Sequence, residues 1–105
     1  MVGIDIVDVS RIAQAVDRFG DRFLHKVFTD EEIRYAKQRK SMYQTLAGRF
    51  AAKEAFMKAV GKGLSWKAIE VLQTGGKPFI IYKHTRYEGV SISHEKAYAV
   101  SVVII

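Results

Sequence analysis

One long helical segment in the middle of the chain constrains the fold most strongly. Residues 43–60 are rich in Ala, Leu, Phe, Met and Lys, and most of these residue types favour helix. The segment is followed by Gly61 and Gly63, and glycine commonly terminates a helix. The sequence therefore predicts one long central helix, and the other elements must lie before and after it.

The elements on either side of this helix follow a simple order. The run VGIDIV at 2–7 is typical of a buried strand, and a helix is expected from about Arg11, capped by Ser10 or Asp8. A short helical turn follows near 23–28, and a capping box at 29–32 opens another helix. After the central helix, strands are expected at 69–73, 79–82, 89–93 and 97–105. The prediction is one α+β domain over 1–105, with an N-terminal strand, helices and an antiparallel strand meander.

Composition excludes several classes of protein. The 105 residues suit one domain, and the absence of cysteine excludes disulfide scaffolds, thiolate metal sites and cysteine nucleophiles. No apolar run is long enough for a membrane span, and Asp5 and Asp8 argue against a signal peptide. We therefore expect a cytoplasmic protein that does not enter a membrane.

Positive charge is concentrated around the central helix. The net charge is +6, which favours an anionic partner. Nine basic residues and a single acid, Glu54, lie between Glu32 and Glu70. The basic residues are Arg34, Lys37, Arg39, Lys40, Arg49, Lys53, Lys58, Lys62 and Lys67.

Two carboxylates interrupt otherwise apolar elements. On a helical wheel, Glu54 falls in the stripe that contains Phe50 and Met57, and Asp5 lies inside the first strand. A buried carboxylate needs a partner, which for Glu54 is either Lys58 at i+4 or a hard cation held against a phosphate. For Asp5 the alternatives are a backbone N–H or an arginine, or the same cation, since Mg²⁺ takes one or two carboxylates together with substrate phosphates.

Three stretches, in this order, resemble the small bacterial 4′-phosphopantetheinyl transferases of the holo-[acyl-carrier-protein] synthase type. They are GIDIV at 3–7, AGRFAAKEAF at 47–56 and VSISH at 90–94, with Gly76-Lys77-Pro78 between the last two. The resemblance implies the 4′-phosphopantetheinyl transferase fold and a place in fatty acid biosynthesis. It also implies transfer of phosphopantetheine from coenzyme A to a serine of apo-acyl carrier protein, with release of adenosine 3′,5′-bisphosphate.

The resemblance also assigns roles within the site. Asp5 and Glu54 would bind Mg²⁺, and Lys58 would act on the leaving-group side as a cation or proton donor. The base would be either Glu54 itself or a water on the metal. Lys53 would help to neutralise the diphosphate. The expected nucleotide contacts are Arg49, Gly76, Lys77, Pro78, Ser93 and His94.

Two interaction surfaces are expected as well. The first helix would dock the acidic carrier protein through Arg11, Arg18, Phe19, Arg22 and Phe23. The family forms homotrimers with active sites at subunit boundaries. The apolar chain end AYAVSVVII would invite aggregation if it were an exposed edge, which is consistent with a trimer, although a monomer could also bury it as a central strand.

One alternative comes from another class of function. A small basic α+β chain could be a nucleic-acid-binding module, but Phe79, Tyr82 and Tyr98 do not form the aromatic pattern of an RNA-binding sheet. Two embedded carboxylates would also repel phosphate in the absence of a metal. We therefore expect no nucleic-acid partner.

Overall fold

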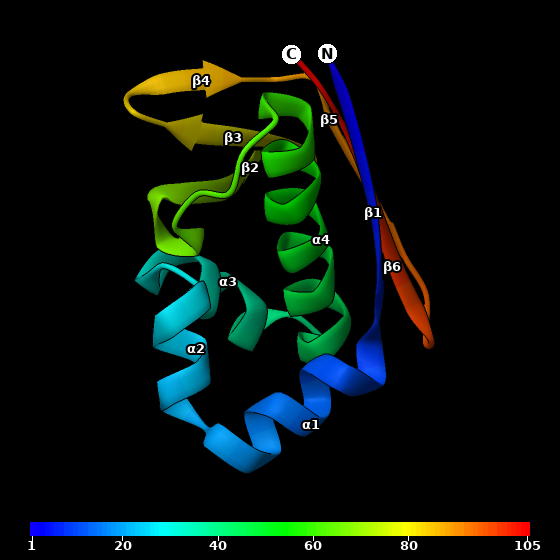
Figure 1. Cartoon of the computed structure of the whole chain (residues 1–105). Coiled ribbons are helices and arrows are strands. Elements are labelled where there is room, and N and C mark those ends of the chain that lie inside the picture. The colour runs from blue at the N-terminus through cyan, green and yellow to red at the C-terminus, as the bar shows by residue number, and fades with distance from the viewer.

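The predicted central helix is the axis of the structure, a computed structural model that describes all residues 1–105 (Figure 1). The elements are β1 (Val2–Asp8), α1 (Val9–Phe19), α2 (Asp21–Val27), α3 (Asp30–Gln38), α4 (Met42–Val60), the 3-10 helix η1 (Trp66–Ala68), β2 (Ile69–Thr74), β3 (Lys77–Tyr82), β4 (Thr85–Tyr87), β5 (Val90–His94) and β6 (Tyr98–Ile104). The α+β fold class is confirmed, and α4 begins and ends within one residue of the predicted segment.

Helix α4 is covered around most of its circumference. Eleven of its nineteen residues are buried, and many of these are alanines. Their small side chains allow the other elements to pack close to the helix. Strand β1 packs directly on its backbone: a Cβ atom at Gly3 would overlap the carbonyl oxygen of Ala55. Glycine at position 3 is therefore what allows this strand to lie so close to the helix.

The strands form two separate sheets. Strand β6 is the middle strand of β1-β6-β5, and β2-β3-β4 is the second three-stranded sheet, with every neighbouring pair antiparallel. The expectation of one meander is wrong in this respect, because the chain leaves the second sheet after β4 and returns to pair with β1. The C-terminal segment is consequently a central strand and not an exposed edge.

The helix starts follow the predicted caps. Asp8 is the N-cap of α1, and its carboxylate accepts hydrogen bonds from the backbone N–H and hydroxyl of Ser10 at 2.9 and 2.7 Å. Thr29 and Glu32 form the capping box of α3. Gly20 ends α1 with a positive φ of 56°, so that α1 and α2 are two helices with different axes (Figure 1). No helix of the structure is both long and apolar enough to cross a bilayer.

Candidate functional site

Asp5 and Glu54 lie in the wall of one cavity of about 400 Å³, which we call the acidic cavity. Asp5 comes from the middle of β1 and Glu54 from the fourth turn of α4, two elements that pack against each other. Asp8, Arg11, Phe23 and Phe50 are among the other residues of the wall. The fold thus brings together the two carboxylates that the sequence singled out.

Lys58 does not line the acidic cavity, but from the next turn of α4 it contacts one of its two carboxylates. Its Nζ lies 3.0 Å from Oδ1 of Asp5 and donates a second hydrogen bond to the carbonyl oxygen of Ile4, also at 3.0 Å. The simple i, i+4 pair with Glu54 is therefore not formed, because β1 supplies a closer acceptor. The Lys58 side chain is 58% exposed, so it can exchange this partner without breaking a packed core.

The environment of Glu54 disfavours its charge. Burial raises the pKa of Glu54, and the neighbouring carboxylate of Asp5 raises it further. Lys58 and the indole N–H of Trp66 oppose this shift, although the indole falls short of hydrogen-bond geometry. Two carboxylates that repel each other in one cavity are a pair that a cation would stabilise.

The donor set fits magnesium better than a transition metal. No group of three or more His, Cys, Asp or Glu side chains is gathered anywhere in the structure. Two oxygen ligands without nitrogen or sulfur are what Mg²⁺ commonly takes from a protein, with waters and substrate phosphates completing its octahedron. The residues present therefore fit an ion that is shared with a phosphorylated substrate.

A second cavity, of about 300 Å³, contains most of the expected nucleotide contacts, and we call it the basic cavity. Arg49, Gly76, Pro78 and His94 lie in its wall. Lys77 and Ser93 are exposed and are not part of this wall. Side chains alternate along a strand, so theirs point to the side opposite to those of the wall residues before and after them. The sequence did not assign six polar residues that also contribute: Tyr35, Arg39, Lys40, Ser41, Thr45 and Gln73. Arg39 and Lys40 could have been found from the concentration of positive charge, whereas Tyr35 and Gln73 carry no such signal.

Arg49 is a buried cation without a carboxylate partner. It is only 5% exposed, its guanidinium lies 4.4 Å from the ring centroid of Tyr35, and Nη2 donates to Oε1 of Gln73 at 3.1 Å. Nε has no hydrogen-bond partner. Burial lowers the pKa of Arg49, but arginine stays protonated at neutral pH. An oriented positive charge with a free donor is suited to an anionic ligand.

His94 closes the other side of the basic cavity. Its Nδ1 lies 2.9 Å from Oε1 of Gln44, and since an amide oxygen only accepts, Nδ1 carries the proton in this pair. Gln44 thus fixes the orientation of the ring and leaves Nε2 for another partner.

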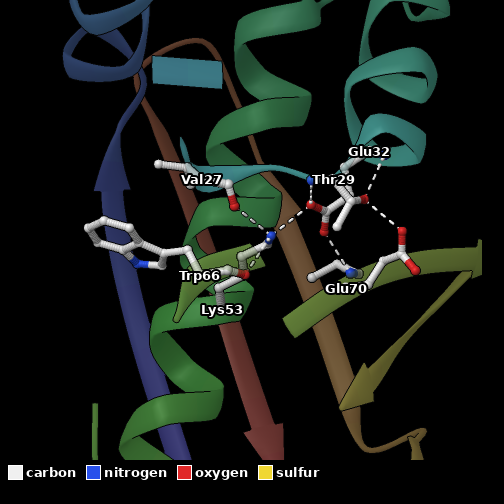
Figure 2. A network of polar contacts seen from close by, with 7 residues as sticks. Val27, Thr29, Glu32, Lys53, Trp66 and Glu70 are labelled. Carbon is white, nitrogen blue, oxygen red and sulfur yellow. Dashed lines mark hydrogen bonds and ion pairs between the residues drawn. The ribbon is translucent and has the colours of Figure 1, made fainter. Parts of the chain in front are cut away.

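Lys53 does not reach either cavity, and its expected role at the diphosphate is wrong for this structure. The side chain is fully buried, and Nζ lies 2.7 Å from Oε1 of Glu32 (Figure 2). It also donates to the carbonyl oxygens of Val27 and Trp66 at 2.8 and 3.0 Å. All three N–H groups of the ammonium are used inside the protein, so none is left for a phosphate.

The expected docking residues do not all belong to the first helix. Arg22 and Phe23 follow Gly20 and lie on α2, so the regular spacing of the three arginines along one helix is broken. Arg11 lies beside the acidic cavity, while Arg22 and Phe23 share a shallow pocket with Phe19 and Lys26. The basic and aromatic residues nevertheless remain close to the acidic cavity, because Phe23 borders both pockets.

The acidic and basic cavities have no residue in common. A single chain therefore presents the carboxylates and the candidate nucleotide contacts in separate places.

Comparison with known proteins covers nearly the whole chain. Residues 1–103 match a family described as the 4′-phosphopantetheinyl transferase superfamily. A holo-[acyl-carrier-protein] synthase of Halothermothrix orenii is 44% identical over 117 aligned residues, which include 98% of this chain and 94% of the relative.

Two solved structures have the same fold. A Bacillus anthracis holo-(acyl-carrier-protein) synthase in complex with CoA (3′,5′-ADP) has a TM-score of 0.84 and 40% identity, covering 97% of this chain and 91% of that one. The Helicobacter pylori synthase in complex with coenzyme A has a TM-score of 0.88 and 32% identity, covering 99% and 98%. The chain belongs to the 4′-phosphopantetheinyl transferase superfamily.

Proposed function

We propose that this chain transfers 4′-phosphopantetheine from coenzyme A to a serine hydroxyl of apo-acyl carrier protein. The serine oxygen attacks the β-phosphorus of the diphosphate, and the bond from that phosphorus to the bridging oxygen breaks. Adenosine 3′,5′-bisphosphate leaves, and the serine proton passes to a base. The observation that carries the proposal is that Asp5 and Glu54 line one cavity, with Lys58 bound to Asp5, in a chain of this superfamily.

Asp5 and Glu54 would hold a magnesium ion in this reaction. When bound, Mg²⁺ supplies positive charge to the phosphate oxygens, where negative charge develops during phosphoryl transfer. The ammonium of Lys58, released from Asp5, would stabilise the leaving phosphate or protonate it. Glu54, or a water on the ion, is the candidate base that takes the serine proton.

The basic cavity is the proposed site for the adenosine bisphosphate end of coenzyme A. Arg49 offers a fixed guanidinium, and Gly76 and Pro78 bring backbone close to the cavity. His94 adds a ring nitrogen on the opposite side. The coenzyme A complexes of the two solved relatives support this assignment of substrate.

The two half-sites would meet between subunits of a homotrimer. The outer face of β1-β6-β5 carries exposed apolar side chains, including Val2 at 64%, Ile4 at 58% and Ile6 at 63%, with Tyr98 and Ile104 beside them on β6. An apolar sheet face of this kind is typical of a surface that another copy covers. The acidic cavity of one protomer would then face the basic cavity of the next.

The acidic carrier protein would dock on α1 and α2. Arg18 and Arg22 are exposed on these helices, and Phe19 and Phe23 supply apolar contact. This surface adjoins the acidic cavity, so a docked carrier could present its serine there. With these substrates we place the protein, as one transferase domain over 1–105, in the cytoplasm.

Intact-mass spectrometry of apo-acyl carrier protein tests the proposal. After incubation with the protein, coenzyme A and Mg²⁺, the carrier should gain the mass of one phosphopantetheine, and EDTA should prevent the gain. Glu54→Gln should abolish it, whereas the exposed substitution Glu95→Gln should not. No gain with several carrier proteins would overturn the transferase assignment, and full activity in EDTA would overturn the metal site.

A further inference from the structure

Trp66 is the only tryptophan of the chain, and it lies on the connection between α4 and β2. Its indole packs against the ring of Phe50, with 5.9 Å between ring centroids and an interplanar angle of 37°. The indole Nε1 is buried and has no hydrogen-bond partner. A buried donor without an acceptor is costly, which calls for an account of what it faces.

The indole packs on Phe50, which is part of the wall of the acidic cavity, although Trp66 itself does not line that cavity. Phe50 and Glu54 are one helical turn apart on α4 and both belong to the cavity wall. The indole N–H lies near enough to Glu54 to lower the pKa of that carboxyl against the larger effect of burial. The Glu54 side chain is only partly buried, so its carboxylate can change rotamer to accept a hydrogen bond from this N–H.

The backbone of Trp66 is held independently of the cavity. The buried ammonium of Lys53 donates to the Trp66 carbonyl oxygen at 3.0 Å, and Figure 2 shows this carbonyl turned towards Lys53 while the indole ring extends away from it. Lys53 is itself fixed by Glu32, which also accepts hydrogen bonds from the backbone N–H groups of Thr29 and Val71, each at 2.7 Å. The backbone of Trp66 is therefore anchored to the buried network that Lys53 and Glu32 form.

We propose that Trp66 is a positioning residue for Glu54, whose carboxylate its indole N–H orients for binding a divalent cation in the acidic cavity. The inference rests on the proposed metal site and deepens it. A carboxylate has two oxygens, so one can accept the indole hydrogen bond while the other is left for the cation. Hydrogen bonds to ligating carboxylates of this kind orient the ligand and increase metal affinity.

Trp66→Phe removes the N–H and retains an aromatic ring against Phe50. Mn²⁺ is the probe, because its binding to the protein saturated with coenzyme A can be titrated by the electron paramagnetic resonance signal of the free ion, without carrier protein or turnover. The dissociation constant for Mn²⁺ should rise about tenfold in Trp66→Phe. Tyr82→Phe is the matched control: it removes a polar atom from an aromatic residue that packs on Phe56, elsewhere on α4, and its Mn²⁺ affinity should match the wild type.

A purely structural role for Trp66 predicts a different result. If Trp66 positions Glu54, Trp66→Phe should keep a melting temperature in EDTA close to that of the wild type and lose only affinity for Mn²⁺. If its role is structural, the melting temperature should fall. If Trp66→Phe is destabilised, a single-site replacement of Trp66 by 3-benzothienylalanine keeps the bicyclic shape and lacks only the N–H. Mn²⁺ affinity within twofold of wild type in that protein would overturn the inference. Failure of the wild type itself to bind Mn²⁺ would overturn the proposed metal site first.

Discussion

Lys53 and Glu32 form an ion pair that is closed to solvent: Nζ lies 2.7 Å from Oε1, and both side chains are fully buried. Burial raises the pKa of Glu32 and lowers the pKa of Lys53, so each charge depends on the other and on neighbouring backbone groups. The pair joins α3 to α4, while Thr29 extends the network to Glu70 through a 2.6 Å hydrogen bond (Figure 2). Lys53 thus connects α4 to α2, α3 and η1, and Glu32 and Thr29 extend the network to β2.

Removal of one partner of this pair should destabilise the protein strongly. Lys53→Met leaves the Glu32 carboxylate buried without its cation, and we expect a loss of about 3–5 kcal/mol in the free energy of unfolding, measured by urea denaturation. The double variant Lys53→Met/Glu32→Gln removes both charges and should recover part of this loss. Equal stability of Lys53→Met and the wild type would contradict the structure.

Lys53 and Glu54 are neighbours in the chain, and together they show what the sequence can and cannot predict. Glu54 was found because a carboxylate on an apolar helix stripe is unusual, and the same reasoning found Asp5 on β1. Lys53 is one residue away but about 100° around the helix, so it points into the core while Glu54 reaches a cavity. Its buried partner, Glu32, lies 21 residues earlier, and no local pattern indicates that contact.

Only part of the basic cavity can be predicted from the sequence, because some of its residues are far apart along the chain. Motif resemblance supplied Arg49 and His94, but Tyr35 and Gln73 enter through tertiary contacts between α3, α4 and β2. The two-sheet arrangement was missed because alternation predicts strands and not their pairing, and β4 has only three residues. From the sequence, Arg22 is expected on the first helix. In the structure Gly20 ends that helix, and Arg22 lies on α2.

Glu54→Gln should stabilise the metal-free protein while abolishing transfer. The pKa of Glu54 is raised above its ordinary value of 4.5, so the folded chain binds that proton more tightly than the unfolded chain. Stability is therefore lost as pH rises from about 4.5 through the raised pKa. In EDTA, Glu54→Gln should equal the wild type near pH 4 and exceed it at pH 7 by no more than about 1 kcal/mol, since solvent screens this partly exposed group.

Thermal unfolding at both pH values measures this difference. Glu95→Gln, which changes an exposed carboxylate, should show no such dependence on pH. A Glu54→Gln protein that is less stable than the wild type at pH 7 in EDTA would mean that Glu54 has a stabilising partner in the free protein.

Arg49→Lys should weaken binding of coenzyme A without removing positive charge. Lysine cannot both stack on Tyr35 and donate to Gln73 as the guanidinium does, so the KM for coenzyme A should rise about tenfold, as expected for a lost charge-assisted hydrogen bond. The exposed substitution Arg34→Lys is the control. If Arg49 binds the 3′-phosphate, the variant and wild type should have similar KM values for dephospho-coenzyme A.

Ile4→Asp should prevent assembly of the proposed homotrimer. Ile4 is 58% exposed on the outer face of β1-β6-β5, opposite Val102, so a carboxylate there is harmless in a monomer and desolvated in an interface. Sedimentation equilibrium should show trimers for the wild type and monomers for Ile4→Asp. Thr85→Asp, on the other sheet, should still assemble. Wild-type monomers at high concentration would exclude the trimer and leave the apolar face unexplained.

Arg22→Glu should impair use of the carrier protein and not of coenzyme A. Reversal of an exposed charge beside Phe19 and Phe23 replaces attraction to an acidic partner by repulsion, so the KM for apo-acyl carrier protein should rise about tenfold or more. Lys62→Glu produces the same change in net charge on an exposed residue just after α4 and should leave this KM near the wild-type value. Added salt should reduce the difference between the two variants in KM for apo-acyl carrier protein, because screening weakens interactions between exposed charges. Equal effects of both substitutions would show that the carrier responds to overall charge, and that α2 is not its docking surface.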